Sequence, residues 1–214
     1  MKKRFFRSSN VNRLVGAMEI LQKREPRTPG LGLIFGPAGR GKSEAVDWYY
    51  SGHDCYYLRG LDLYNPRWLL QDLILMMEPR AEVRWSTADR FHQARQLLMK
   101  YRHPVFIDEA DYLLRKGCLD VLRDLHDLTD VPIILIGMDT ICSALLARPQ
   151  FWSRLLQTAI IEWQPLTASE LCLVFREWTG LSLVPGAAEI LCQIREGDFR
   201  DLMSDFVDLE MACA

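Results

Sequence analysis

The stretch LIFGPAGRGKSEA, residues 33–45, runs from a short apolar segment into a loop that holds three glycines, a lysine and a serine. Residues 36–43 satisfy the pattern G-x-x-x-x-G-K-[ST] at every fixed position. In a chain of this length, average composition gives such a match by chance on the order of 1 time in 100. The pattern binds phosphate when a strand precedes it and a helix follows it, and the flanking residues predict both.

The loop therefore predicts a site for a nucleoside triphosphate and Mg²⁺. Glycines let backbone N–H groups converge on phosphate oxygens, and the start of the helix adds a partial positive charge. Lys42 is expected to reach the β- and γ-phosphates, and the Ser43 hydroxyl to ligate Mg²⁺. The alternative is a glycine-rich turn that binds nothing. The other expected contacts are Gly36, Pro37, Ala38, Gly39, Arg40 and Gly41.

A pair of acids follows a second apolar segment, VFIDE at residues 105–109. Asp108 is expected to hold Mg²⁺ directly or through water. Glu109 is placed to orient and deprotonate a water that attacks the γ-phosphate. The alternative is a strand that ends in acids only because it enters solvent. A P-loop kinase for small molecules would not need Glu109, so its presence favours hydrolysis.

Apolar strand-like runs alternate with helical periods from residue 31 to 163, which predicts an α/β fold with a parallel five-stranded sheet flanked by helices. After residue 166 the pattern is wholly helical, which predicts a small C-terminal lid. We expect an N-terminal helix and linker at 1–30, a nucleotide-binding core at 31–165 and the lid at 166–214. The expected strands are 31–35, 54–58, 104–111, 131–139 and 158–163. The expected helices are 10–24, 42–50, 65–77, 86–101, 117–128, 167–178, 186–195 and 198–211.

The composition and net charge limit the class of protein and its partners. The 214 residues are 49% hydrophobic and 25% charged, as in soluble globular proteins. The net charge of −2 argues against a nucleic-acid footprint over the whole surface, so any DNA contact should be local. No apolar run approaches the roughly 18 residues that span a bilayer, and the basic start lacks the features of a secretion signal. We therefore expect a cytoplasmic protein without a membrane partner.

Taken together, the two motifs resemble those of the AAA+ ATPases, and three weaker features follow in the order of that family. The family has a polar sensor residue at the end of its fourth strand, and here that strand ends in Gly137-Met138-Asp139. The resemblance implies a catalytic role for Asp139, the nearest polar residue, although Met138 could occupy the same position.

The segment ARPQFWSRL at 147–155 looks like the family's arginine-finger segment, in which an arginine of one subunit reaches the γ-phosphate held by the next. The resemblance implies this role for Arg154, with Arg148 in reserve, because a fixed guanidinium neutralises charge that grows in the transition state. The alternative is a surface arginine paired with local acids. The lid sequence GDFR at 197–200 similarly implies that Arg200 is a second sensor, against the alternative of a purely structural arginine.

Within that family, the stretch LHDLTDVPIILIGMDTICSALLARPQFWSRLL at 125–156 is similar to the transposition regulators MuB, TnsC and TniB. This branch implies a bacterial, phage or transposon protein that oligomerises with ATP, as a ring or helical filament, on double-stranded DNA and acts with a cognate transposase. DNA would be held through its phosphates, without sequence readout. The alternatives are a helicase loader, a secretion-associated ATPase or a small-molecule kinase. Candidate DNA contacts, which otherwise are ordinary solvated charges, are Lys100, Arg102, Arg115 and Lys116.

Overall fold

The structure is a computed structural model that describes residues 5–115 and 117–213. Its centre is a five-stranded sheet in the order β2-β3-β4-β1-β5, and every pair of neighbouring strands is parallel. This confirms the predicted fold class. The strands are β1 (Leu31–Phe35), β2 (Tyr56–Arg59), β3 (Val105–Asp108), β4 (Ile133–Gly137) and β5 (Leu155–Glu162).

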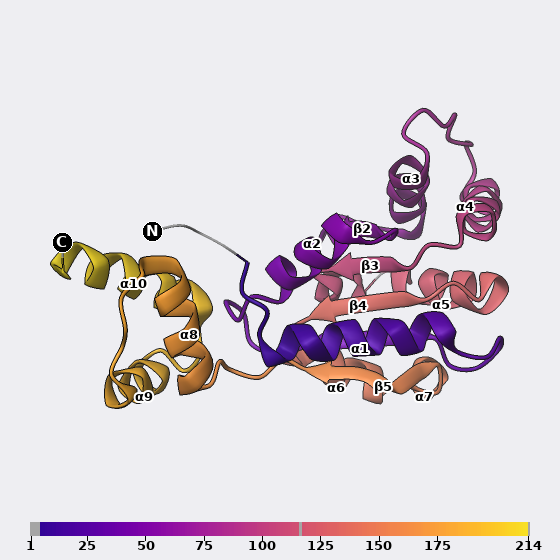
Figure 1. The fold of residues 1–214 in the computed structure, drawn as a ribbon. Helices are drawn as coiled ribbons and strands as arrows, with labels where there is room; N and C mark the ends of the chain where they lie inside the picture. Colours follow the sequence, from indigo (N-terminus) through magenta and orange to yellow (C-terminus); the bar gives the residue numbers. More distant parts are fainter. Residues whose placement is uncertain (1–4, 116, 214) are drawn as a thin grey trace.

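Helices cover both faces of the sheet, and three more stand beside it (Figure 1). In chain order they are α1 (Ser9–Lys23), α2 (Lys42–Gly52), α3 (Pro66–Met77), α4 (Thr87–Tyr101), the 3₁₀ helix η1 (Ala110–Leu114), α5 (Cys118–Thr129), α6 (Asp139–Leu146), α7 (Pro149–Trp152), α8 (Ala168–Thr179), α9 (Pro185–Ile194) and α10 (Phe199–Cys213). Within the described ranges, no helix is both long and apolar enough to cross a membrane.

Several helices begin where side chains cap them. Ser8 accepts a hydrogen bond from the Val11 backbone N–H at the start of α1, and Asn65 does the same for α3. Thr167 and Glu170 form a complete capping box at the start of α8. These caps satisfy N–H groups that have no partner inside the helix, which explains why sequence patterns located these starts closely.

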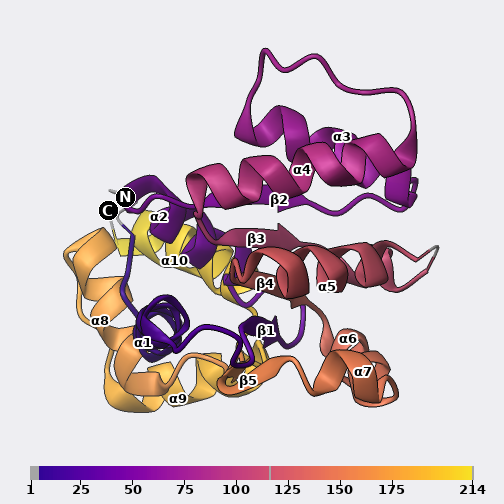
Figure 2. The ribbon, with the colours of Figure 1, turned by 90° about the vertical axis from the view of Figure 1, so that its right-hand side faces the viewer.

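Successive side chains of the strands point to opposite faces of the sheet and pack into two separate hydrophobic cores. One core lies under α1 and α2 and takes Ile34 and Phe106 from the strands. The other lies under α3, α4, α5 and α6 and takes Leu33 and Ile107. Figure 2 shows α3 and α4 as a pair on the side of the sheet that carries β2, with the loop that joins them extending away from the body. Both faces of the central strands are therefore buried, as their apolar runs predicted.

The last three helices have a hydrophobic core of their own. Phe175 of α8 and Phe206 of α10 meet edge to face with 4.9 Å between ring centroids, and both are buried. Phe5 packs against the core under α1 and α2, whereas its neighbour Phe6 packs against the core of α8–α10. The N-terminal segment therefore contacts both parts of the molecule.

Three strands are shorter than predicted, and the first of them, β2, spans 56–59 in place of 54–58. β3 ends at Asp108, not at residue 111, because Glu109 takes a left-handed backbone with φ 53° and η1 follows directly. β4 spans 133–137 in place of 131–139, and α6 begins at Asp139. β5 begins at Leu155, three residues before the predicted start. At β4 the apolar run begins before the strand, because Val131 is buried without being part of it.

Candidate active site

The glycine loop joins β1 to α2 at the carboxyl edge of the sheet, where parallel α/β sheets bind ligands. Gly36, Gly39 and Gly41 all have positive φ, at 148°, 76° and 82°. A Cβ at Gly39 would collide with the carboxylate of Asp198, and one at Gly36 would lie 3.0 Å from the carbonyl oxygen of Trp163. The loop therefore needs glycine for its backbone angles and for close approach by other segments.

Lys42 lies inside the loop that it follows. Its Nζ donates to the carbonyl oxygens of Gly36 and Pro37, each at 2.7 Å. Burial lowers the pKa of Lys42, and the positive charge of Arg40 lowers it further. The nearby carboxylates of Asp108, Asp139 and Asp111 act in the opposite direction. The ammonium group thus stands among acids at the centre of the candidate site.

A cavity of about 400 Å³ brings the predicted residues together. The loop lines it from residue 38 to 43, and the strand ends contribute Asp108, Glu109 and Met138. The third helix of the lid contributes Phe199, Arg200 and Met203. Volume, converging backbone N–H groups, a lysine and a buried carboxylate all fit a nucleoside triphosphate with Mg²⁺.

The carboxylate of Asp108 is held by two hydrogen bonds. The Tyr57 hydroxyl donates to Oδ2 at 2.7 Å, and the Glu109 backbone N–H donates to Oδ1 at 2.8 Å. Asp108 is only 5% exposed. Burial, together with the hydrogen bond to Asp108, raises the pKa of Tyr57, so its hydroxyl stays protonated and acts as the donor.

Glu109 forms an ion pair with the last residue of β2. The distance between Arg59 Nη2 and Glu109 Oε1 is 3.2 Å, and both side chains are partly exposed. Neither Tyr57 nor Arg59 was identified from the sequence. Both lie on β2, and only the strand order shows that β2 is the neighbour of β3.

The end of β4 is tied to the segment after β3 by Asp111. Its Oδ2 accepts from the Met138 backbone N–H at 2.7 Å, and its Oδ1 accepts from the Thr140 hydroxyl at 2.6 Å. Met138 lines the cavity, whereas Asp139 begins α6 and acts on Lys42 through its charge. Of the two candidates for the sensor position, Met138 therefore contacts the cavity, and Asp139 influences it through its charge. Sequence reasoning missed Asp111, although it stands three residues after Asp108 in the same acidic run.

Four hydrogen bonds join the loop to Trp163, which follows β5, and to the segment around the start of α10. Arg40 donates to the carbonyl oxygens of Trp163 and Glu196, each at 3.3 Å, and the Trp163 indole N–H donates back to the Arg40 carbonyl at 2.8 Å. The backbone N–H of Phe199 donates to the Gly39 carbonyl at 2.9 Å. The segment that leads into α10 thus contacts the glycine loop directly.

Arg200 lies in the wall of the cavity. Asp198 caps α10, accepting from the Arg200 N–H at 2.8 Å, as its sequence position predicted. Asp198 also fills the space beside Gly39. The roles assigned to these residues remain predictions, but the structure brings the lid arginine and the loop into one cavity.

Arg154 lies at the opposite edge of the sheet. Its carbonyl accepts from the N–H of Leu31, at the beginning of β1, whereas the glycine loop follows the end of that strand. Its Nε lies 2.7 Å from both carboxylate oxygens of Asp127, and this hydrogen-bonded pair raises the pKa of Arg154. Arg148 donates to the Leu114 carbonyl at 2.8 Å. Arg154 therefore pairs with a local acid in the single chain and is remote from its own glycine loop.

The predicted DNA contacts do not form one patch. Lys100 and Arg102 precede β3 and lie at the amino edge of the sheet, whereas Arg115 follows β3 and η1 near the carboxyl edge. The ammonium group of Lys100 lies 2.9 Å from the Tyr101 hydroxyl. Lys116 lies outside the described residues.

Comparison with solved structures shows the same fold in several other proteins. The Aeropyrum pernix ORC1 protein, solved in complex with DNA, is 18% identical with a TM-score of 0.61, over 92% of this chain and 57% of that one. A Walker-type ATPase of Pyrococcus abyssi is 16% identical with a TM-score of 0.63, over 96% and 72%. Domain III of the Thermotoga maritima replication initiation protein DnaA is 15% identical with a TM-score of 0.53, over 92% and 81%.

At these identities the likeness establishes the shared fold, and the chain spans little more than half of the ORC1 protein. No curated protein matches the sequence. The family model described as AAA domain matches residues 24–145, more than half of the chain and the whole of the glycine loop and the acidic strand end. On that match, the chain belongs to the AAA domain family.

Proposed function

We propose that the chain is a magnesium-dependent ATPase whose nucleotide state controls its assembly on double-stranded DNA, and that it regulates transposition. The observation that carries the proposal is the convergence of Lys42, Asp108 and Glu109 on one cavity. A glycine turn without a ligand would have no reason to bury an ammonium group beside a carboxylate that is 5% exposed.

The loop and α2 would bind the phosphates. Lys42 exchanges the carbonyl oxygens of Gly36 and Pro37 for phosphate oxygens, and the backbone N–H groups at the start of α2 donate to the same group. Ser43 and Asp108 would hold Mg²⁺, which supplies charge neutralisation on the phosphates when bound.

A smaller apolar hollow beside Gly41 supports placing the base of the nucleotide there. Its walls include Phe5 of the N-terminal segment, Trp163 directly after β5, and Trp178 and Phe199 of the lid. Aromatic walls suit a planar heterocycle. Nucleotide bound in both hollows would contact the core and the lid at once, which supports a lid position that depends on the nucleotide.

Hydrolysis would use Glu109 as the base. Its carboxylate accepts a proton from water as that water attacks the γ-phosphate, and ADP leaves with its phosphates still held by Lys42. The ion pair with Arg59 must open before the carboxylate can turn fully to the water. Arg200, in the lid wall of the cavity, would stabilise charge on the transferred group. The presence of Glu109 in the cavity favours this reaction over phosphoryl transfer by a small-molecule kinase.

Assembly would complete the site. Because Arg154 and the glycine loop lie at opposite edges of the same sheet, copies stacked head to tail would bring Arg154 of one copy to the loop of the next. Such heterologous contacts produce rings or open helical filaments. In the single chain the guanidinium is neutralised by Asp127, so the proposal requires that this pair opens on assembly.

DNA binding and the partnership with a transposase rest on the order of sequence features in residues 125–156. The candidates for phosphate contacts are Lys100 and Arg102, before β3, and Arg115, after η1, which Lys116 follows in the sequence. Contacts of this kind hold duplex DNA without reading its sequence and weaken with salt.

The test is retention of random-sequence duplex DNA with and without MgATP. The proposal predicts retention that needs ATP, falls with salt and is lost in Lys42→Ala. Equal retention without nucleotide would refute control by ATP. A preference for single strands would favour a helicase loader, and a fixed small assembly at saturating ATP would favour a kinase.

A further inference from the structure

The second strand of the chain places a hydroxyl against the carboxylate that follows the third. β2 and β3 pair in register, with Tyr57 opposite Phe106 and Arg59 opposite Asp108. From the position of Tyr57 the side chain reaches diagonally along the sheet, and its hydroxyl lies 2.7 Å from Asp108 Oδ2. The two residues that this hydrogen bond joins are 51 positions apart in the sequence.

We propose that Tyr57 is a positioning residue for Mg²⁺, which fixes the orientation of the Asp108 carboxylate. This inference rests on the proposed function, since it concerns the same site. Tyr57 occupies one lone pair of Oδ2, and the Glu109 backbone N–H occupies one lone pair of Oδ1. A carboxylate has about four lone-pair sites, so each oxygen keeps one for a ligand while the plane of the group is held.

The environment of Asp108 makes such a support necessary. The side chain is almost fully buried, so bulk water does not orient it. Asp47 lies on α2 one turn after Ser43, and burial followed by the charge of Asp108 raises the pKa of Asp47. The two acids therefore repel each other. A protonated hydroxyl that donates to Asp108 counters this repulsion and holds the carboxylate at the end of β3.

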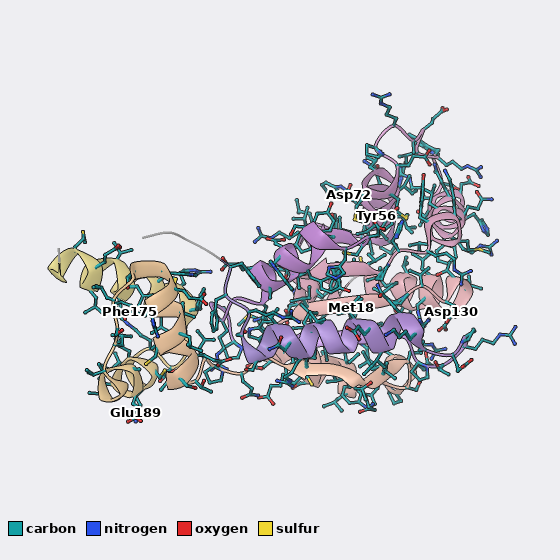
Figure 3. All side chains as sticks on the ribbon, viewed as in Figure 1. Met18, Tyr56, Asp72, Asp130, Phe175 and Glu189 are labelled. Carbon is teal, nitrogen blue, oxygen red and sulfur yellow. The ribbon has the colours of Figure 1, made fainter. Side chains whose placement is uncertain are left out.

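The ring of Tyr57 is anchored independently of its hydroxyl. It packs against the core under α1 and α2, and its centroid lies 6.3 Å from that of Tyr50. Removing the hydroxyl alone should therefore leave the strand and the ring in place while releasing the carboxylate. The adjacent residue, Tyr56, faces the other side of the sheet, against Tyr101 and His103, and is labelled near α3 in Figure 3.

The experiment compares Tyr57→Phe with the matched control Tyr56→Phe. Binding of a slowly hydrolysed fluorescent ATP analogue is followed while Mg²⁺ is titrated, and once more in excess chelator. Groups that orient a metal-ligating carboxylate typically contribute 10- to 100-fold in metal affinity, so Tyr57→Phe should raise the Mg²⁺ midpoint about 10-fold. Tyr56→Phe should leave the midpoint unchanged, and neither variant should alter binding in chelator.

An unchanged Mg²⁺ midpoint in Tyr57→Phe would overturn the inference. A lowered midpoint would also overturn it, because it would show that the hydroxyl competes with the metal for Asp108. An equal rise in both tyrosine variants would also overturn it, since a general loosening of β2 would explain the result. The double variant Tyr57→Phe/Asp108→Asn should bind the analogue as Asp108→Asn does, and a further additive loss would contradict a route through Asp108. If the unaltered chain shows no Mg²⁺-dependent binding, the proposed function fails together with the inference.

Discussion

Arg59 and Glu109 form an ion pair between the ends of two adjacent parallel strands, with 3.2 Å between Nη2 and Oε1. Glu109 is the residue expected to activate water, so the pair holds the base by its charge before any substrate is involved. Arg59 is the more exposed partner, with 68% of its side chain accessible against 39% for Glu109. The interaction is therefore weak enough to open during turnover.

Arg59→Ala should raise basal ATP turnover about 2- to 5-fold, because an exposed pair of this kind is worth about 0.2–1 kcal/mol and its opening would no longer be required. Phosphate release at saturating MgATP measures the effect, and Glu109→Gln supplies the inactive reference. A fall of Arg59→Ala to the level of Glu109→Gln would show that Arg59 supports the base and does not restrain it.

Arg154→Ala should reduce turnover by on the order of 10³-fold if its guanidinium completes the site of a neighbouring copy. The decisive measurement mixes two inactive variants. Lys42→Ala retains Arg154, and Arg154→Ala retains the glycine loop, so mixed assemblies contain some complete sites. Recovery of activity on mixing is expected, whereas no recovery at any ratio would contradict a site shared between copies.

Asp127→Asn tests the role of Arg154 by changing its partner in the ion pair. It frees Arg154 without removing it, since both oxygens of Asp127 accept from Arg154 Nε. The variant should assemble at equal or lower protein concentration than the unaltered chain, as read by sedimentation with MgATP. Loss of assembly in Asp127→Asn would indicate that the pair itself stabilises the interface.

Arg40→Ala should loosen the lid. Arg40 donates to carbonyl oxygens of Trp163 and Glu196, which lie on either side of the lid's first two helices. Hydrogen bonds from charged donors are worth about 1.5–3 kcal/mol at good geometry, and these are long, so we expect amide exchange in residues 196–200 to accelerate about 10-fold. Hydrogen exchange with mass spectrometry measures it. Unchanged exchange there would show that the Gly39–Phe199 hydrogen bond alone holds the lid.

Acid should weaken the fold through His126. Its side chain is 4% exposed, its Nδ1 lies 2.8 Å from the Val131 carbonyl, and burial lowers the pKa of the imidazole. Because the folded pKa lies below the unfolded one, the unfolded chain takes up the proton first as pH falls below about 6.5. Stability is therefore full above that pH and is lost towards the folded pKa.

Urea unfolding at pH 7.5 and 5.5 tests this assignment. The stability lost between the two values should be smaller in His126→Gln than in the unaltered chain. His92→Gln, at an exposed position of α4, is the matched control and should retain the full loss. A loss in His126→Gln equal to that of the control would assign the acid sensitivity elsewhere.

Local chemistry explains which parts of this molecule could be predicted from sequence. The glycine loop is a contiguous motif whose backbone angles require glycine, and the buried strands are apolar runs in the sequence. Both could therefore be predicted from the sequence alone. Tyr57 and Arg59 were missed because their importance arises from the pairing of β2 with β3, a non-local property. The length of β3 was overestimated because nothing in the sequence after its apolar run marks the left-handed turn at Glu109.

The role of Arg154 could not be predicted fully from the sequence. The sequence suggested that it acts on a neighbouring copy and also allowed a simple surface pair, and in the single chain it does pair with Asp127. Two elements distant in sequence, α5 and the start of β5, create that contact. A role between copies is a property of the assembly and is encoded only indirectly in one chain.

Phosphate release from ATP, measured with nucleotide binding in the same samples, tests the central claim most directly. The account predicts Mg²⁺-dependent turnover by the unaltered chain, loss of both binding and turnover in Lys42→Ala, and retained binding without turnover in Glu109→Gln. Turnover that survives in Glu109→Gln, or MgATP binding that survives unchanged in Lys42→Ala, would contradict the assignment of this cavity as the site of hydrolysis.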